Sequence, residues 1–81
     1  MEQADRYYIC RYAGGNAPSG QPFLDFWNKS TGEWQTNDPS EECRYDDANQ
    51  AHEDLGKTGC QTAWVGNRYF QAVDRNGKLT R

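Results

Sequence analysis

Few residues of this chain are of the types that perform catalysis or bind metals. The sequence has one histidine, His52, and three cysteines, Cys10, Cys43 and Cys60. Their ligand atoms suit Zn²⁺, but structural zinc sites usually show paired ligands such as C-x₂-C, and the sequence has no such pair. No serine or cysteine stands in a known nucleophile motif, and the glycines match no phosphate-binding pattern. We therefore expect a non-enzymatic protein without metal or cofactor, in which His52 is a half-buried structural residue.

The charged residues are distributed unevenly along the chain. The net charge is −3, but residues 38–55 hold seven acidic residues against the single basic Arg44, whereas residues 56–81 hold five basic residues against Asp74. An acidic segment of this kind can attract a basic partner, such as a protein whose groove is built to hold phosphates. The same carboxylates also suit helix caps and a solvated helix face, so both interpretations stay open.

The length predicts one domain, residues 1–81, and the composition predicts an aromatic core. Only nine of the 81 residues are Leu, Ile, Val or Phe, while aromatic residues make up 14 % of the chain. Each ring can bury about 150–250 Å², so a few rings can replace many aliphatic side chains. No apolar run approaches the roughly 18 residues of a membrane span, and the first ten residues lack the pattern of a signal peptide. Together with the odd number of cysteines, this favours a cytoplasmic location.

The order of the segments predicts an α+β fold: a mostly antiparallel, twisted sheet of four to six strands with one short helix packed on it. Residues 13–21 are rich in glycine and are expected to form a loop, and residues 28–32 a turn with Gly32 at positive φ. Residues 42–45 are expected to form a short extended piece before the helix. Strands are predicted at residues 6–12, 23–27, 33–36, 60–65, 68–73 and 78–80.

One segment has the pattern of a helix, at residues 47–55. Asp46 or Asp47 can cap its N-terminus, and a glutamine three residues after Asp47 completes a capping-box pattern. Either Gly56 or Gly59 is expected to end it.

Bulky side chains occupy both alternating faces of the strands predicted at 6–12 and 23–27. One short helix can cover only one face of a sheet. The sheet must therefore coil on itself, or some aromatic side chains must face the solvent. Exposed aromatic clusters often mark partner-binding surfaces, and Trp27 and Trp34 are the candidates here.

Most of the chain is spanned by four segments: an aromatic first strand (YYICRY), a hairpin (FLDFWNKSTGEW), an acid-led short helix (DDANQAHEDL) and a closing pair of strands. This arrangement resembles small proteins of phages and mobile elements, including anti-CRISPR proteins. The resemblance implies an inhibitor in the host cytosol that binds, without catalysis, a host protein or ribonucleoprotein complex that handles nucleic acid. The candidate partner-binding residues are Asp38, Glu41, Glu42, Asp46, Asp47, Glu53, Asp54, Trp27 and Trp34.

A second hypothesis is a small nucleic-acid-binding module that uses the C-terminal hairpin. This part of the chain interleaves rings that can stack on bases with basic residues that can contact phosphates. The residues concerned are Trp64, Arg68, Tyr69, Phe70, Arg75, Lys78 and Arg81. The acidic net charge argues against it, because nucleic-acid-binding domains are more often basic. A third possibility is a structural subunit that forms a homo-oligomer.

Overall fold

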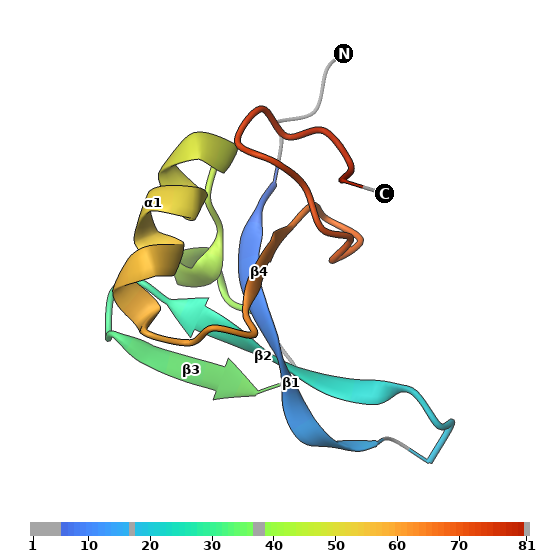
Figure 1. Ribbon diagram of the computed structural model, residues 1–81. Coiled ribbons are helices and arrows are strands. Elements are labelled where there is room, and N and C mark those ends of the chain that lie inside the picture. Colours follow the sequence, from blue (N-terminus) through green and yellow to red (C-terminus); the bar gives the residue numbers. More distant parts are fainter. Residues whose placement is uncertain (1–5, 17, 37–38, 81) are drawn as a thin grey trace.

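In the part of the chain that the structure describes, residues 6–16, 18–36 and 39–80, antiparallel strands form a sheet in the order β3-β2-β1-β4 (Figure 1). The structure is a computed structural model. Its strands are β1 (Tyr8–Asn16), β2 (Pro22–Asn28), β3 (Glu33–Thr36) and β4 (Trp64–Gly66), and between β3 and β4 lie the 3₁₀ helix η1 (Glu41–Cys43) and the α-helix α1 (Ala48–Thr58). The predicted α+β fold, with one short α-helix on an antiparallel sheet, is confirmed, and the sheet has four strands.

The β2–β3 hairpin forms where the sequence predicts it. Gly32 has a φ of 71°, and its N–H donates to the carbonyl of Asn28 at 2.8 Å. Glycine adopts this left-handed conformation without steric cost. The side-chain oxygen of Asn28 accepts from the backbone N–H groups of Ser30 (2.9 Å) and Thr31 (3.2 Å). The turn is thus stabilised by local hydrogen bonds that its own residues supply.

The first strand is longer than predicted. Residues 13–16, expected in a loop, continue β1, and the register to β2 shifts between Tyr12 and Asn16. Gly14, with a φ of 93°, lies in this irregular stretch. A bulge of this kind lets a strand continue through glycines that composition alone places in a loop. Because β4 pairs only with residues 8–10 of β1, the ends of β1 and β2 form an arm that extends past β4 (Figure 1).

Helix α1 begins and ends at residues that the sequence predicts as caps. Asp47 is the N-cap, and its side chain accepts from the N–H of Asn49 at 3.0 Å. Gly59 is the C-cap, in the left-handed conformation with a φ of 73°. The helix extends beyond the predicted end at residue 55. The predicted capping box is wrong, because the side chain of Gln50 donates instead to Asp54 at 3.3 Å.

The predicted extended piece at residues 42–45 is wrong for Glu42 and Cys43, which are helical, whereas Arg44 is extended, with a φ of −82° and a ψ of 137°. η1 occupies Glu41–Cys43, and only Tyr45 makes a strand-like contact. The backbones of Tyr7 and Tyr45 exchange two hydrogen bonds, of 2.9 and 2.8 Å. This bridge fixes the segment before α1 against the start of β1.

Replacing Asp47 by Ala should lower the free energy of unfolding by about 1 kcal/mol, because the first turn of α1 loses its side-chain acceptor. Urea denaturation followed by circular dichroism measures this loss. Asp46→Ala is the matched control: it removes the same charge one residue earlier, where the carboxylate makes a surface ion pair with Arg44 at 3.1 Å. Equal losses in the two variants would contradict a specific capping role.

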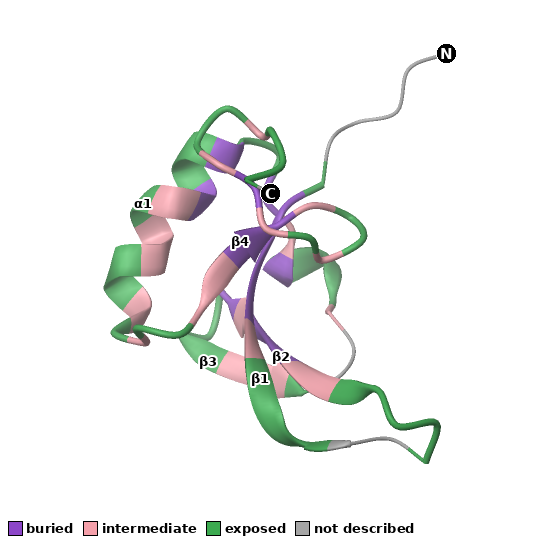
Figure 2. Ribbon diagram, turned by 45° about the vertical axis from the view of Figure 1, so that its right-hand side comes forward, coloured by how far each residue is buried: buried purple, intermediate pink, exposed green. Residues whose placement is uncertain are grey.

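Hydrophobic side chains are buried on both faces of the sheet. Figure 2 shows that the buried part of β1 is the part that lies beside β4. The cluster beneath α1 contains Tyr7, Ile9, Tyr45, Ala48, Ala51, Val65 and Val73. The cluster on the other face contains Tyr8, Cys10, Phe26 and Cys43, with Leu24, Trp64 and Phe70 packed against it. Alternate side chains of β1 therefore belong to different hydrophobic cores: Ile9 packs in the first core, beneath α1, and Tyr8 and Cys10 pack in the second core, on the opposite face.

The segment after β4 does not form the strands predicted at 68–73 and 78–80. The pairing described there consists of isolated bridges. A tight loop interrupts it: the N–H of Asn67 donates to the carbonyl of Gln71 at 3.0 Å. The side-chain oxygen of Asn67 accepts from the N–H groups of Tyr69 (2.8 Å) and Gln71 (3.1 Å). Asn67 thus stabilises a turn within what its neighbours' β propensity predicts to be a strand.

Phe70 lies in this loop and covers the second core. Its φ of 65° is unusual for a bulky residue. Its ring packs 4.9 Å from that of Phe26 and 5.7 Å from that of Tyr8, and its carbonyl accepts from the indole N–H of Trp64 at 3.0 Å. A Cβ on Gly66 would lie 2.9 Å from the Phe70 backbone, so the close approach of the loop requires glycine at that position.

Candidate functional site

The acidic candidates come from η1, the connection after it and α1; Asp38 lies outside the described residues. The guanidinium group of Arg44 contacts the carboxylates of Glu41 (3.8 Å) and Asp46 (3.1 Å). The side chains of Glu41 and Asp46 nevertheless stay 84 % and 73 % exposed. One arginine therefore holds two solvent-facing carboxylates close together.

The position of η1 is fixed by the turn between β2 and β3. The amide of Asn28 donates to the carboxylate of Glu42 at 3.2 Å. Lys29 donates to the backbone carbonyls of Glu42, at 3.1 Å, and Arg44, and its ammonium group lies 4.5 Å from the ring centre of Tyr45. These contacts place η1 beside the turn between β2 and β3. No local sequence pattern indicates that the two segments lie together.

Three side chains contact the carboxylate of Asp54: Gln50 and Lys57 on α1, and Tyr45 from the segment before it. The hydroxyl of Tyr45 donates to its carboxylate at 2.7 Å, Gln50 donates at 3.3 Å, and Lys57 lies at 3.5 Å. The hydrogen bond from Tyr45 is the main cause that lowers the pKa of Asp54. Burial, together with the hydrogen bond to Asp54, raises the pKa of Tyr45 well above its ordinary value. Asp54 is thus ionised and fixed in place at neutral pH.

The acidic face is our name for Glu41, Glu42, Asp46, Asp47, Glu53 and Asp54. Three of them, Asp46, Asp47 and Asp54, line a shallow depression of about 500 Å³ together with Lys29, Arg44, Tyr45 and Gln50. Asp47 also caps α1, so it has a structural role. Glu53 is exposed, and within the described residues no hydrogen bond or ion pair of its side chain is seen. The structure therefore brings most of the predicted acidic residues to one region, where carboxylates outnumber cations.

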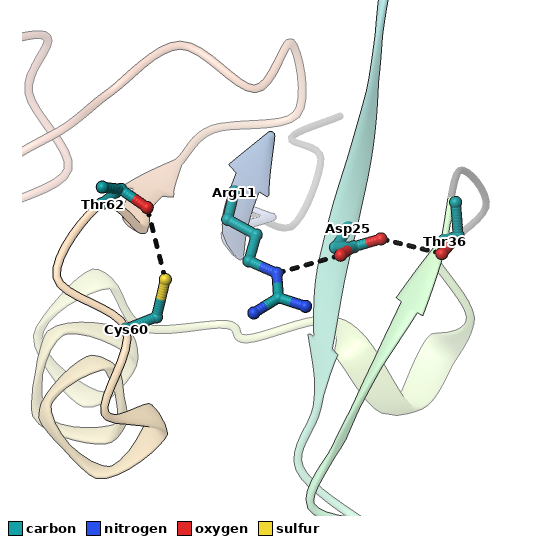
Figure 3. A network of polar contacts seen from close by, with 5 residues as sticks. All are labelled: Arg11, Asp25, Thr36, Cys60 and Thr62. Atoms are coloured by element: carbon teal, nitrogen blue, oxygen red, sulfur yellow. Dashed lines mark hydrogen bonds and ion pairs between the residues drawn. The ribbon is translucent and has the colours of Figure 1, made fainter. Parts of the chain in front are cut away.

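The two predicted tryptophans pack inside the fold. Trp27 and Trp34 meet edge to face, with ring centres 5.3 Å apart, and pack half-buried against the core beneath α1. The guanidinium group of Arg11 lies 4.2 Å over the ring of Trp34. Arg11 is held there by Asp25, at 2.9 Å, whose carboxylate also accepts from Thr36 at 2.8 Å (Figure 3). A role for these tryptophans in partner binding stays a prediction, and their observed contacts are internal.

The four candidate zinc ligands serve other contacts. Cys10 and Cys43 are buried free thiols, and burial raises the pKa of Cys10 to about 12. Cys60 lies 3.4 Å from the hydroxyl of Thr62, a contact that lowers its pKa (Figure 3). His52 is half-buried, as predicted, with Nε2 2.9 Å from the carbonyl of Val73. Across residues 6–16, 18–36 and 39–80, no three His, Cys, Asp or Glu side chains are placed to hold a metal ion.

The most exposed aromatic residues are two tyrosines and not the predicted Trp27 and Trp34. Tyr12 and Tyr69 are 63 % and 66 % exposed, and Leu79 is 55 % exposed. Tyr12 is on the same face of β1 as Tyr8 and Cys10, but it lies beyond the residues of β1 that pair with β4. The difference in length between β1 and β4 therefore leaves Tyr12 exposed, and knowing it would have identified this residue. Tyr69 lies in a loop that was predicted as a strand.

No protein-family model, curated protein or solved structure matches this chain. Among the described residues, no helix combines the length and apolar character needed to cross a bilayer.

Proposed function

We propose that this protein is a small, non-enzymatic inhibitor that binds a basic surface of a host protein or ribonucleoprotein complex that handles nucleic acid. The observation that carries the proposal is the convergence of exposed carboxylates on the acidic face, around Arg44 and the N-terminus of α1. A groove whose lysines and arginines normally hold phosphates would find several negative charges there. The sequence resemblance to anti-CRISPR proteins supports a host defence complex in the host cytosol as the target.

The inhibitory step in this proposal is competition. A protein bound in a phosphate-binding groove excludes the nucleic acid from it, and no chemical reaction is needed. Several carboxylates are held in place before binding: Arg44 positions Glu41 and Asp46, and Tyr45 positions Asp54. Side chains that are already ordered lose less conformational entropy on association, which favours tight binding.

Neutralising Glu41, Asp46 and Glu53 together, as Glu41→Gln, Asp46→Asn and Glu53→Gln, should weaken partner capture by roughly 3- to 100-fold, because each exposed ion pair contributes about 0.2–1 kcal/mol. The variant leaves Asp47 and Asp54, which have structural contacts, unchanged. The measurement is capture of bacterial lysate proteins on the immobilised chain at low and at high salt, quantified by mass spectrometry. The captured complex is then purified, and its binding to nucleic acid is measured with and without the native protein.

A matched pair of single substitutions tests whether position matters. Glu41→Gln and Gln21→Lys each raise the net charge by one, and both residues are exposed. Gln21 directly precedes β2, at the opposite end of that strand from Asn28, which contacts Glu42. Only Glu41→Gln should reduce capture and inhibition. Capture that is insensitive to salt and to all of these variants would refute the electrostatic mechanism.

A further inference from the structure

A groove lies on the sheet face opposite α1 and is bordered by exposed aromatic and apolar side chains. Its volume is about 530 Å³, and it is lined by Tyr12, Trp64, Phe70, Gln71, Ala72 and Leu79. The rings of Tyr12 and Trp64 lie 5.0 Å apart, tilted by 46°, so they form one wall of the groove. Trp64 is fixed through its indole N–H, which donates to Phe70. Tyr12 and Leu79 remain accessible to solvent at this groove.

The surroundings of the groove are positively charged. None of the lining residues is acidic. Arg68 and Lys78 are exposed and lie in the segments that provide Phe70 and Leu79. The guanidinium group of Arg68 lies 5.0 Å from the ring centre of Tyr69. Asp74 accepts hydrogen bonds from the backbone N–H groups of the turn that follows it and stays negatively charged. Residues 64–80 nevertheless hold three basic residues against this one carboxylate. The charge of this surface therefore complements an anionic ligand.

We propose that this groove and the loop beside it bind single-stranded nucleic acid. One base stacks on Tyr12 in the groove and another on Tyr69, which precedes Phe70 in the adjoining loop, while phosphates contact Arg68 and Lys78. An acidic peptide also fits the charge, but the exposed rings of Tyr12 and Tyr69 favour the flat faces of bases, which stack on aromatic side chains. Stacking needs no directed hydrogen bond, because every base has a π-face. This binding goes beyond the proposed function and does not depend on it, since the acidic face is not involved.

The test uses a fluorescein-labelled 15-nucleotide oligothymidylate and the full chain, with fluorescence anisotropy as the readout. The native protein should bind it, and Tyr12→Ala and Tyr69→Ala should each weaken binding about tenfold. Tyr12→Phe and Tyr69→Phe keep the rings and should bind like the native protein. For two phosphate contacts, the logarithm of the binding constant should fall with that of the salt concentration with a slope of about −1.4. Arg68→Gln should reduce the steepness of this slope to about −0.7.

Three results would overturn the proposal. The first is no anisotropy change at the lowest salt concentration. The second is binding that survives both alanine substitutions in variants whose circular dichroism is native. The third is equal binding of a polyglutamate peptide with the same dependence on both tyrosines, which would assign the groove to acidic peptides. If an alanine variant fails to fold, the phenylalanine variants and the Arg68→Gln slope decide the outcome.

Discussion

Replacing Phe26 by Ala should remove most of the stability of the protein. Phe26 is 2 % exposed and is the largest fully buried side chain of the second core, where it contacts the rings of Tyr8 and Phe70. Removing a buried phenylalanine costs about 3–5 kcal/mol, because apolar contacts are lost and a cavity remains. Domains of this size have a total stability at the low end of about 5–15 kcal/mol. Thermal unfolding monitored by near-ultraviolet circular dichroism measures the loss.

Phe23→Ala is the matched control for this prediction. Phe23 lies in the same strand, β2, but points to the opposite face and is only half-buried. Its replacement should cost about 1 kcal/mol or less, since much of its ring is already in contact with water. Equal losses at the two positions would mean that the face opposite α1 is not an essential core.

Replacing Tyr45 by Phe should change the stability of the protein and its dependence on pH. At neutral pH the variant loses the hydrogen bond to the ionised Asp54, which costs about 1.5–3 kcal/mol. Because folding raises the pKa of Tyr45, its contribution is fully present below its ordinary value of 10 and is lost as the pH rises above that value. The variant lacks this alkaline loss. Urea denaturation at a series of pH values from neutral to alkaline measures both effects.

The same substitution should act on the acid side through Asp54. Folding lowers the pKa of Asp54, so its contribution to stability is present above its ordinary value of 3.8 and is lost as the pH falls below it. Without the Tyr45 hydroxyl, the pKa of Asp54 should rise towards 3.8, which a carboxyl ¹³C titration can follow. Tyr12→Phe, which removes an exposed hydroxyl, is the control and should change neither limb. An identical alkaline loss in Tyr45→Phe and the native protein would contradict the role of this hydroxyl.

Features set by short-range chemistry could be predicted from the sequence. Gly32 provides the positive φ of a hairpin turn, Asp47 caps the first turn of α1, and Gly59 ends the helix. Each of these depends on the conformational preference or hydrogen bond of a single residue acting on its neighbours. The α+β class followed because a run of strand patterns precedes a single helical segment and further strand patterns follow it, which suits an antiparallel sheet with one helix.

Features set by long-range packing could not be predicted. The guanidinium group of Arg11, a residue of another strand, covers the ring of Trp34. The residues next to Trp34 in the sequence therefore gave no sign that its ring would be half-buried. Phe70 leaves the strand conformation because its ring completes the second core and Asn67 closes a turn around it. The convergence of Glu41 and Asp46 depends on Arg44 and on the anchoring of η1 by Lys29. The acidic composition was evident from the sequence, but its spatial arrangement was not.

The position of β1 in the sheet has a consequence for how the chain reaches this structure. Its two sheet neighbours are β2, which follows it directly, and β4, which pairs Gly66 with Tyr8 across most of the chain. Closing so long a loop is slow, because its entropy is lost before the new contacts form. During synthesis the strands β1 to β3 can pair first, but one edge of β1 and the face opposite α1 stay uncovered until residues 64–73 leave the ribosome. The nascent chain is therefore most exposed to misassociation and chaperone binding before residues 64–73 fold back onto β1.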